Sequence, residues 1–264
     1  TIVEHASAKE PDHRLRGDLD FDHVNLKVGG KTILQDIDLH IAAGQKLGIM
    51  GTTGSGKTSL INLLNRFYDV TDGTVSIDGI DVREIPLSTL RRSVSMAMQD
   101  VFLFSDTVEG NIAYGAPEMP FEEVRKWAKA ADADGFVNRM EEGYDTLIGE
   151  RGVGLSGGQR QRISLARAIA MKPSVLVLDD TTSAVDMETE KYIQHQLRNL
   201  PFPCTKVMIA QKVSSVQDAD EIIILDEGKI IERGTHEELL AKRGYYYGIW
   251  ALQNSIEEVD PLGA

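Results

Sequence analysis

The first third of the chain alternates between apolar and polar residues in several short stretches. Residues 37–41 show this alternation most clearly, as expected for a strand with one buried face. Residues 21–28 are a weaker candidate for a strand, and residues 74–79 end in a turn signal at Gly79 that favours a hairpin. Together these stretches predict a small antiparallel sheet.

Helical spacing follows further along the chain. Residues 120–140 carry apolar side chains every three or four positions, which predicts a helix, and residues 157–171 predict a second helix that ends before Pro173. Residues 174–178 are mostly apolar, which is typical of a parallel strand buried on both faces. The residues expected to share one face of the first helix are Phe121, Val124, Trp127, Ala128 and Ala131.

The last part of the chain predicts further alternation of helices and strands. We expect a helix over residues 188–197, a strand over 206–210, a hairpin over 221–232 and helices over 236–241 and 245–253. Strands that alternate with helices indicate an α/β fold with a mostly parallel sheet.

The chain begins with a polar stretch, residues 1–17, that has no hydrophobic periodicity and is expected to be a linker or tail. We expect one domain over residues 18–264. A helical subdomain of about residues 100–170 is expected to be inserted in its core.

A glycine-rich loop that ends in lysine and threonine lies between an apolar run, residues 47–50, and a helical stretch, residues 59–64. Its glycines would let backbone N–H groups and the helix N-terminus close around phosphate oxygens. Lys57 would supply charge to the β- and γ-phosphates, and the Thr58 hydroxyl would bind Mg²⁺. An ordinary glycine-rich turn is the alternative, which the lysine and threonine disfavour. This phosphate loop consists of Gly51, Thr52, Thr53, Gly54, Ser55, Gly56, Lys57 and Thr58, with Ser59 directly after it.

Two carboxylates end the apolar run of residues 174–178. Asp179 would hold Mg²⁺ at the strand end, and Asp180 follows it. Many buried strands end in aspartate, so this pattern is weak alone. Its position downstream of the phosphate loop strengthens it.

A second glycine-containing motif, residues 155–159, opens the helix of residues 157–171. Its Ser156 hydroxyl and the glycine N–H groups could form an anion site. The alternative is a plain serine cap followed by flexible glycines. Together with the phosphate loop, this signature makes the chain resemble the nucleotide-binding domain of ATP-binding cassette (ABC) transporters, from about Leu19 to Gln253. The nucleotide-binding residues of the signature are Ser156, Gly157, Gly158 and Gln159.

The resemblance implies a P-loop NTPase core with an antiparallel β-subdomain and an inserted helical subdomain, and ATP and Mg²⁺ as ligands. Gln99 resembles the Q-loop glutamine, which meets Mg²⁺ and the attacking water, and residues 183–186 resemble the D-loop, which includes Asp186. Residues 148–152 resemble the exporter loop that touches the membrane domain.

The resemblance also implies partners. Two such domains pair head to tail, so that each ATP lies between one domain's phosphate loop and the other's signature. The expected partners are a second nucleotide-binding domain and transmembrane domains, and the expected location is the cytoplasmic face of the cell membrane.

Three positions depart from the family pattern. Asp180 stands where the family has a glutamate base, Gln211 stands where it has a switch histidine, and Val28 stands where it has an adenine-stacking aromatic residue. Glutamine carries no positive charge, and valine has no π face. The three departures are either tolerated or engineered variations, or marks of a degenerate site, that is, a nucleotide site that has lost its catalytic function. A chain with a degenerate site and an intact signature resembles one half of a heterodimeric exporter.

Composition narrows the choice of function. The 264 residues carry a formal net charge of −13, which argues against a nucleic-acid partner, and the single cysteine, Cys204, suits a reducing compartment. No apolar run approaches the roughly 20 residues needed to cross a bilayer. The sequence leaves three hypotheses for the function: an energy-coupling ATPase domain of a heterodimeric exporter, a regulatory ATP-binding module with negligible hydrolysis, and a soluble cassette ATPase in translation or DNA repair. The charge opposes the third.

Overall fold

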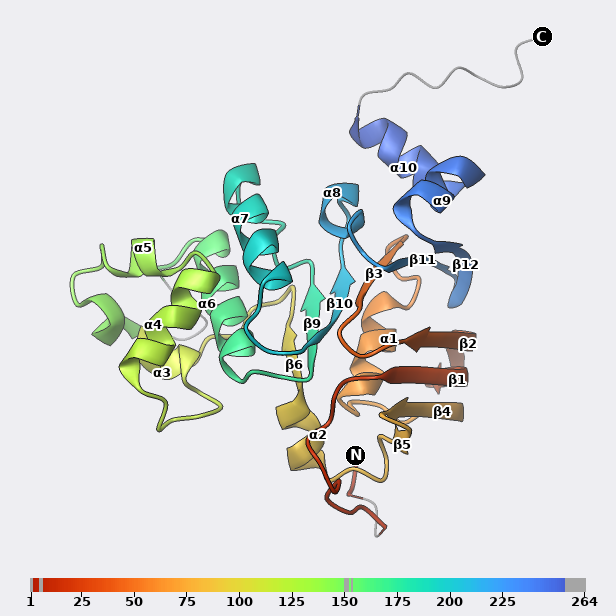
Figure 1. Ribbon diagram of the computed structural model, residues 1–264, viewed down its shortest axis with the longest axis horizontal. Helices are drawn as coiled ribbons and strands as arrows, with labels where there is room; N and C mark the ends of the chain where they lie inside the picture. Colours follow the sequence, from red (N-terminus) through yellow and green to blue (C-terminus); the bar gives the residue numbers. More distant parts are fainter. Residues whose placement is uncertain (1, 5–6, 150–151, 153, 255–264) are drawn as a thin grey trace.

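The computed structural model describes residues 2–4, 7–149, 152 and 154–254. Its central sheet has the strand order β12-β11-β3-β10-β9-β6 and is parallel except for β12, which pairs antiparallel with β11 (Figure 1). The buried apolar strand expected at residues 174–178 is β9, whose residues are all buried. The strands are β3 (Lys46–Gly51), β6 (Val94–Ala97), β9 (Val175–Asp179), β10 (Thr205–Ile209), β11 (Glu221–Asp226) and β12 (Lys229–Gly234).

A second sheet, entirely antiparallel, has the order β2-β1-β4-β5, which confirms the antiparallel β-subdomain. Its strands alternate buried and exposed residues, because one face covers the core and the other faces solvent. Leu34 of β2 packs close to the phosphate loop: a Cβ on Gly56 would lie 2.9 Å from the Leu34 side chain. The strands are β1 (Leu19–Val28), β2 (Lys31–Ile41), β4 (Asp72–Ile77) and β5 (Ile80–Asp81).

The helical part of the chain and the antiparallel sheet lie on opposite sides of the central sheet (Figure 1). It ends with the long helix α6, which contacts α3, α4 and β6 and so joins this part to the sheet. Its elements are α3 (Val108–Ile112), α4 (Phe121–Ala130), α5 (Asp134–Val137), the 3₁₀ turn η1 (Gly143–Asp145), the short strands β7 (Asp106–Thr107) and β8 (Leu147–Ile148), and α6 (Gly157–Ala170).

The prediction of one continuous helix over residues 120–140 is wrong. The chain leaves α4 after Ala130, and Asp132 adopts the left-handed conformation with φ 56° before α5 begins. Aspartate tolerates this conformation better than most residues. Its carbonyl and carboxylate both accept hydrogen bonds from Arg162 Nη1 of α6, at 2.9 and 2.8 Å, which hold the break in place. Phe121, expected on the buried face, is 43% exposed.

Two hydrophobic clusters lie on opposite faces of the central sheet. One joins the antiparallel sheet to α1 (Lys57–Leu64), and the other joins the helical part to the far face of the sheet. The segment expected to be a linker reaches the first cluster at its end, where Leu15 is 3% exposed. The Asp78 carboxylate accepts hydrogen bonds from the backbone N–H groups of Gly17 and Asp18, at 3.1 and 2.9 Å.

The remaining helices complete the domain. The helices expected near residues 188–197, 236–241 and 245–253 are α7, α9 and α10, whereas α2 and α8 are short elements without a clear periodic pattern. Among the described residues, no helix is both long enough and apolar enough to cross a membrane. Their bounds are α2 (Leu87–Ser93), α7 (Met187–Arg198), α8 (Val213–Val216), α9 (His236–Lys242) and α10 (Tyr245–Gln253).

Candidate functional site

The phosphate loop connects β3 to α1, and its shape depends on glycine. Gly51 has φ 143°, and a Cβ at this position would lie 2.0 Å from the carbonyl oxygen of Leu225. No other residue fits there without moving the backbone. Ser55 fixes the middle of the loop, because its N–H donates to the Thr52 carbonyl at 3.2 Å and its carbonyl accepts from Gly228 N at 3.0 Å.

The loop has the groups that a phosphate needs. α1 begins after Gly56, which provides no side-chain cap, so the helix N-terminus offers its N–H groups and its dipole to an anion. Lys57 Nζ donates to the carbonyls of Gly51 and Thr52 at 2.9 and 2.6 Å, which holds the ammonium over the loop. Burial lowers the pKa of Lys57. Ser55 Oγ is buried and has no hydrogen-bond partner among the described residues.

A cleft of about 580 Å³ opens beside this loop. The residues that follow β6, β9 and β10 reach it, because the carboxyl ends of these parallel strands meet at one edge of the sheet. The fold thus brings together residues that are far apart in the sequence. Those of the candidate site that line this cleft, here the phosphate cleft, are Gly51, Thr52, Thr53, Gly54, Lys57, Thr58, Gln99, Asp179, Asp180 and Gln211.

Asp179 and Thr58 form a pair of oxygen donors at the floor of the phosphate cleft. Thr58 Oγ1 donates to Asp179 Oδ2 at 3.4 Å, and Asp179 is 5% exposed. Burial, and then the charge of Asp180, raises the pKa of Asp179. A buried carboxylate of this kind fits Mg²⁺, which binds few protein oxygens and completes its shell with water and phosphate.

Asp180 has a left-handed backbone, with φ 49°, and its N–H donates to the Ile209 carbonyl at 2.9 Å. Burial raises the pKa of its carboxyl group, while a Ser183 hydrogen bond and the charge of Lys212 oppose that rise. Gln211 is exposed at the cleft, and its carbonyl accepts a hydrogen bond from Gln253 Nε2 at 2.8 Å.

The four signature residues do not line the phosphate cleft. Ser156 caps α6: its Oγ accepts from Gln159 N at 3.2 Å, and Gln159 Oε1 accepts from Ser156 N at 2.9 Å. Gly157 lines a different cleft, of about 740 Å³, which Gln99 also reaches. A Cβ on Gly158 would lie 2.7 Å from the Ala184 carbonyl, so glycine is needed where α6 meets the segment after Asp180.

Sequence reasoning missed Gln161, which connects the signature helix to this segment. Gln161 is buried, and its Nε2 donates to the Asp180 carbonyl and to Ser183 Oγ, at 3.3 and 3.1 Å. Its Oε1 accepts from Ala184 N at 3.2 Å. No sequence signal pointed to it, because a glutamine within an amphipathic helix has no distinctive pattern.

Asp186 and Val28 are among the candidate residues that do not line the phosphate cleft. Asp186 is exposed and caps α7, where its carboxylate accepts from Thr189 N at 2.9 Å. That backbone hydrogen bond lowers the pKa of Asp186. Val28 is 42% exposed at the end of β1, opposite Lys31 of β2.

The exporter-like loop is described only in part. Ile148 is buried in β8, where it pairs with Asp106 of β7. Glu150 and Arg151 lie outside the described residues.

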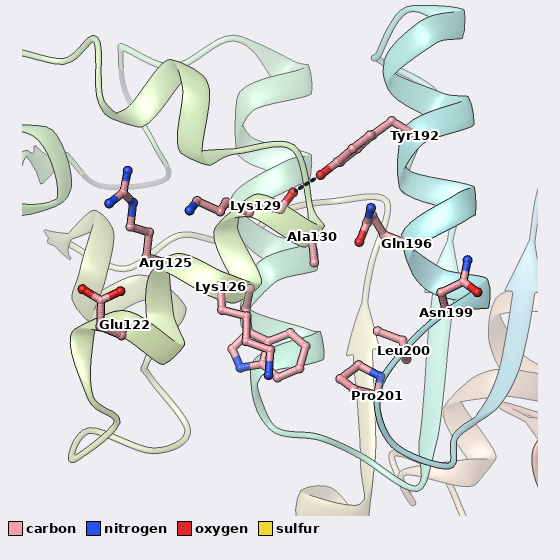
Figure 2. A pocket seen from close by; sticks show the side chains of 11 residues that line it. Glu122, Arg125, Lys126, Lys129, Ala130, Tyr192, Gln196, Asn199, Leu200 and Pro201 are labelled. Atoms are coloured by element: carbon pink, nitrogen blue, oxygen red, sulfur yellow. Dashed lines mark hydrogen bonds between the residues drawn. The ribbon is translucent and has the colours of Figure 1, made fainter.

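A groove of about 330 Å³ between α4 and α7 is separate from both clefts. Figure 2 shows the Tyr192 hydroxyl donating to the Lys129 carbonyl across it, at 3.1 Å. None of the candidate nucleotide-site residues lines this groove.

Comparison with known proteins agrees with this geometry. The ABC transporter family model matches residues 34–183, which include the phosphate loop, the signature and both strand-end carboxylates. This chain belongs to the ABC transporter family. The part of that family to which it is similar is the ATP-binding domain.

The chain is similar to bacterial proteins described as an ABC transporter ATP-binding protein and as a flippase. An uncharacterized ABC transporter ATP-binding protein of Bacillus subtilis (strain 168), YknU, is 44% identical over 254 residues, which are 96% of this chain and 43% of that protein. An ATP-dependent lipid A-core flippase of Yersinia pestis bv. Antiqua (strain Antiqua) is 45% identical over 236 residues, which are 88% of this chain and 40% of the flippase.

A solved structure of a bacterial Atm1-family ABC exporter with ATP bound superposes on this ABC domain with a TM-score of 0.92 and 37% identity. The match covers 96% of this chain and 45% of that exporter. The P-loop fold is therefore confirmed. The chain spans less than half the length of the relatives it matches.

Proposed function

We propose that this chain is the ATP-binding and ATP-hydrolysing domain that powers export of a substrate across a membrane, by pairing head to tail with a second such domain around ATP. The observation that carries the proposal is the separation of the two nucleotide motifs. Lys57 and Thr58 line one cleft, whereas Gly157 of the signature lines another. A bound nucleotide meets both motifs when the signature comes from a partner.

The chain's own residues would bind and orient the nucleotide. The phosphate loop surrounds the phosphates, and Lys57 leaves its two carbonyl partners to neutralise them. Thr58, Asp179 and Gln99 are the candidate Mg²⁺ residues, and the ion when bound neutralises charge on the β- and γ-phosphates. Asp180 would accept the proton of the attacking water, and Gln211 would donate to the γ-phosphate.

We further propose that this site is degenerate and that the intact signature serves a working site on the partner. Asp180 is one methylene shorter than the glutamate of the family, and Gln211 supplies a neutral donor in place of a cation. The partner would be a second nucleotide-binding domain, and transmembrane domains would lie in the part of the protein outside this chain. The flippase and the exporter among the similar proteins support the exporter role, with the domain at the cytoplasmic face of the membrane.

The second candidate is a regulatory ATP-binding module with negligible hydrolysis. The same two residues, Asp180 and Gln211, favour it, because both weaken the hydrolytic machinery while the binding loop stays complete. Turnover of the paired assembly distinguishes the two candidates: the exporter domain supports it, and the regulatory module does not.

The pairing is tested by mixing two inactive variants. In a background that carries Asp180→Glu and Gln211→His, Lys57→Ala should lose nucleotide binding, and Ser156→Ala should lose the signature. Each alone should release phosphate at a few per cent of the background rate at most. The mixture should recover at least roughly a tenth of that rate, because one site then combines the intact loop and the intact signature.

Thr235→Ala is the matched control for Ser156→Ala. Thr235 and Glu238 form the same capping arrangement at α9 that Ser156 and Gln159 form at α6. Losing either cap costs roughly 1 kcal/mol of stability. Thr235→Ala should nevertheless keep turnover, which would show that the loss in Ser156→Ala does not come from the missing helix cap. A mixture that stays inactive contradicts pairing of one chain's loop with the other's signature.

An aromatic side chain at position 28 should add a stacking contact with the adenine base of the nucleotide. Val28 is exposed, and the β2 strand beside it packs on the phosphate loop through Leu34. We expect Val28→Tyr to tighten ATP binding by on the order of 1 kcal/mol through stacking. Calorimetric titration with Val28→Leu as the control measures this. Equal affinities for the two variants would count against a base contact at this position.

A further inference from the structure

The side-chain amide of Gln253 spans the segment that contains Gln211. Gln253 Nε2 donates to the Gln211 carbonyl, and Gln253 Oε1 accepts from Val213 N, both at 2.8 Å. The two bonds enclose residues 211–213, here called the switch segment. Since one planar amide satisfies a carbonyl and an N–H two residues apart, its position determines the path of the backbone between them.

Gln253 is the last residue of α10, and the other end of that helix is anchored. Tyr245 N and Tyr246 N donate to the Glu232 carboxylate of β12, at 2.5 and 3.2 Å. Tyr246 is fully buried, and its hydroxyl lies 2.7 Å from His236 Nδ1. Because β12 belongs to the sheet that carries the phosphate loop, α10 is tied to the same frame as the loop.

A second contact holds the switch segment from α7. Lys212 Nζ lies 3.0 Å from Glu190 Oε2, and Ser215 Oγ donates to Glu190 Oε1 at 2.5 Å. Figure 1 shows α8, which follows the switch segment, between α7 and α10. The backbone of the segment is therefore held on both sides, while Gln211 itself is exposed at the phosphate cleft.

We propose that Gln253 is a positioning residue: through its two backbone hydrogen bonds, the C-terminal helix α10 directs Gln211 at the γ-phosphate end of the phosphate cleft. This inference rests on the proposed function, in which Gln211 faces that phosphate. Tyr245 and Ile249 of α10 line the same cleft, so a displacement of the helix also changes the cleft wall.

The first test is amide hydrogen exchange at Val213. Gln253→Ala removes both hydrogen bonds and should speed exchange of the Val213 N–H at least about tenfold. Gln253→Glu keeps the acceptor for Val213 N but sets a second acceptor against the Gln211 carbonyl, so its exchange should lie between that of Gln253→Ala and that of the unmodified chain. Leu252→Ala, at a neighbour that is 76% exposed, is the matched control. Unchanged exchange in Gln253→Ala overturns the proposal.

The second test separates positioning from a structural role by comparing two nucleotides. Gln253→Ala should weaken a non-hydrolysable ATP analogue about fivefold and leave ADP affinity unchanged, because only the analogue has a γ-phosphate. In a Gln211→Ala background the same change should have no effect on the analogue. Equal weakening of both nucleotides, or the same loss without the Gln211 side chain, overturns the inference alone. No analogue binding by the unmodified chain overturns the proposed function as well.

Discussion

Hydrolysis of MgATP should rise at least about a hundredfold when Asp180→Glu and Gln211→His are combined, and by more than either substitution achieves alone. The longer carboxylate of glutamate brings the base closer to the water, and a misplacement of about 1 Å can cost about a hundredfold in rate. Histidine can take up a proton and carry a positive charge, which glutamine cannot do. Base and switch act on the same water and phosphate, so their effects need not add. Steady-state phosphate release at saturating MgATP measures the gain.

Removal of the Asp180 carboxylate is the control for this experiment. Asp180→Ala should change the slow hydrolysis rate of the unmodified chain little. Asp180→Ala combined with Gln211→His should show none of the gain expected for Asp180→Glu combined with Gln211→His. The gain should also require an intact signature on the facing chain. Turnover of the unmodified chain at roughly 10 per second, a typical enzyme rate, would show that its own site is not degenerate.

Lys57→Ala should weaken ATP binding at least about a hundredfold. The ammonium is the charged donor of the phosphate loop, and each hydrogen bond to a charged group contributes roughly 1.5–3 kcal/mol. In the free chain Lys57 Nζ donates to the carbonyls of Gly51 and Thr52, and it gives up these bonds when it turns to the phosphates. The expected loss of affinity therefore comes from the missing charge. Isothermal calorimetry with MgATP measures the loss.

Lys129→Ala is the matched control, because it removes an exposed lysine of α4 that lines the separate groove between α4 and α7 and does not line the phosphate cleft. Its ATP affinity should equal that of the unmodified chain. Thermal unfolding of both variants without nucleotide checks that the domain stays folded. A folded Lys57→Ala variant with unchanged affinity would exclude the phosphate loop as the nucleotide site.

The fold could be predicted where the hydrophobic pattern is long and local. The alternation near residues 37–41 became β2, the apolar run became β9, and residues 157–171 became α6. The helix predicted over residues 120–140 failed at Asp132, because its left-handed conformation is held by Arg162 of α6, a contact that local periodicity does not reveal. Short elements such as β6 and α8 carry too few residues to show a period.

The phosphate loop is the part of the site that the sequence determined by itself, because its function depends on backbone conformations and N–H groups that a short run of glycines allows locally. Which other side chains meet it was decided by the tertiary structure. Gln99, Asp179 and Gln211 converge because the carboxyl ends of three parallel strands meet at one edge. Gln253 reaches the switch segment only because β12 anchors α10. Such contacts depend on how elements that are distant in the sequence pack together, and the sequence around each residue does not reveal that packing.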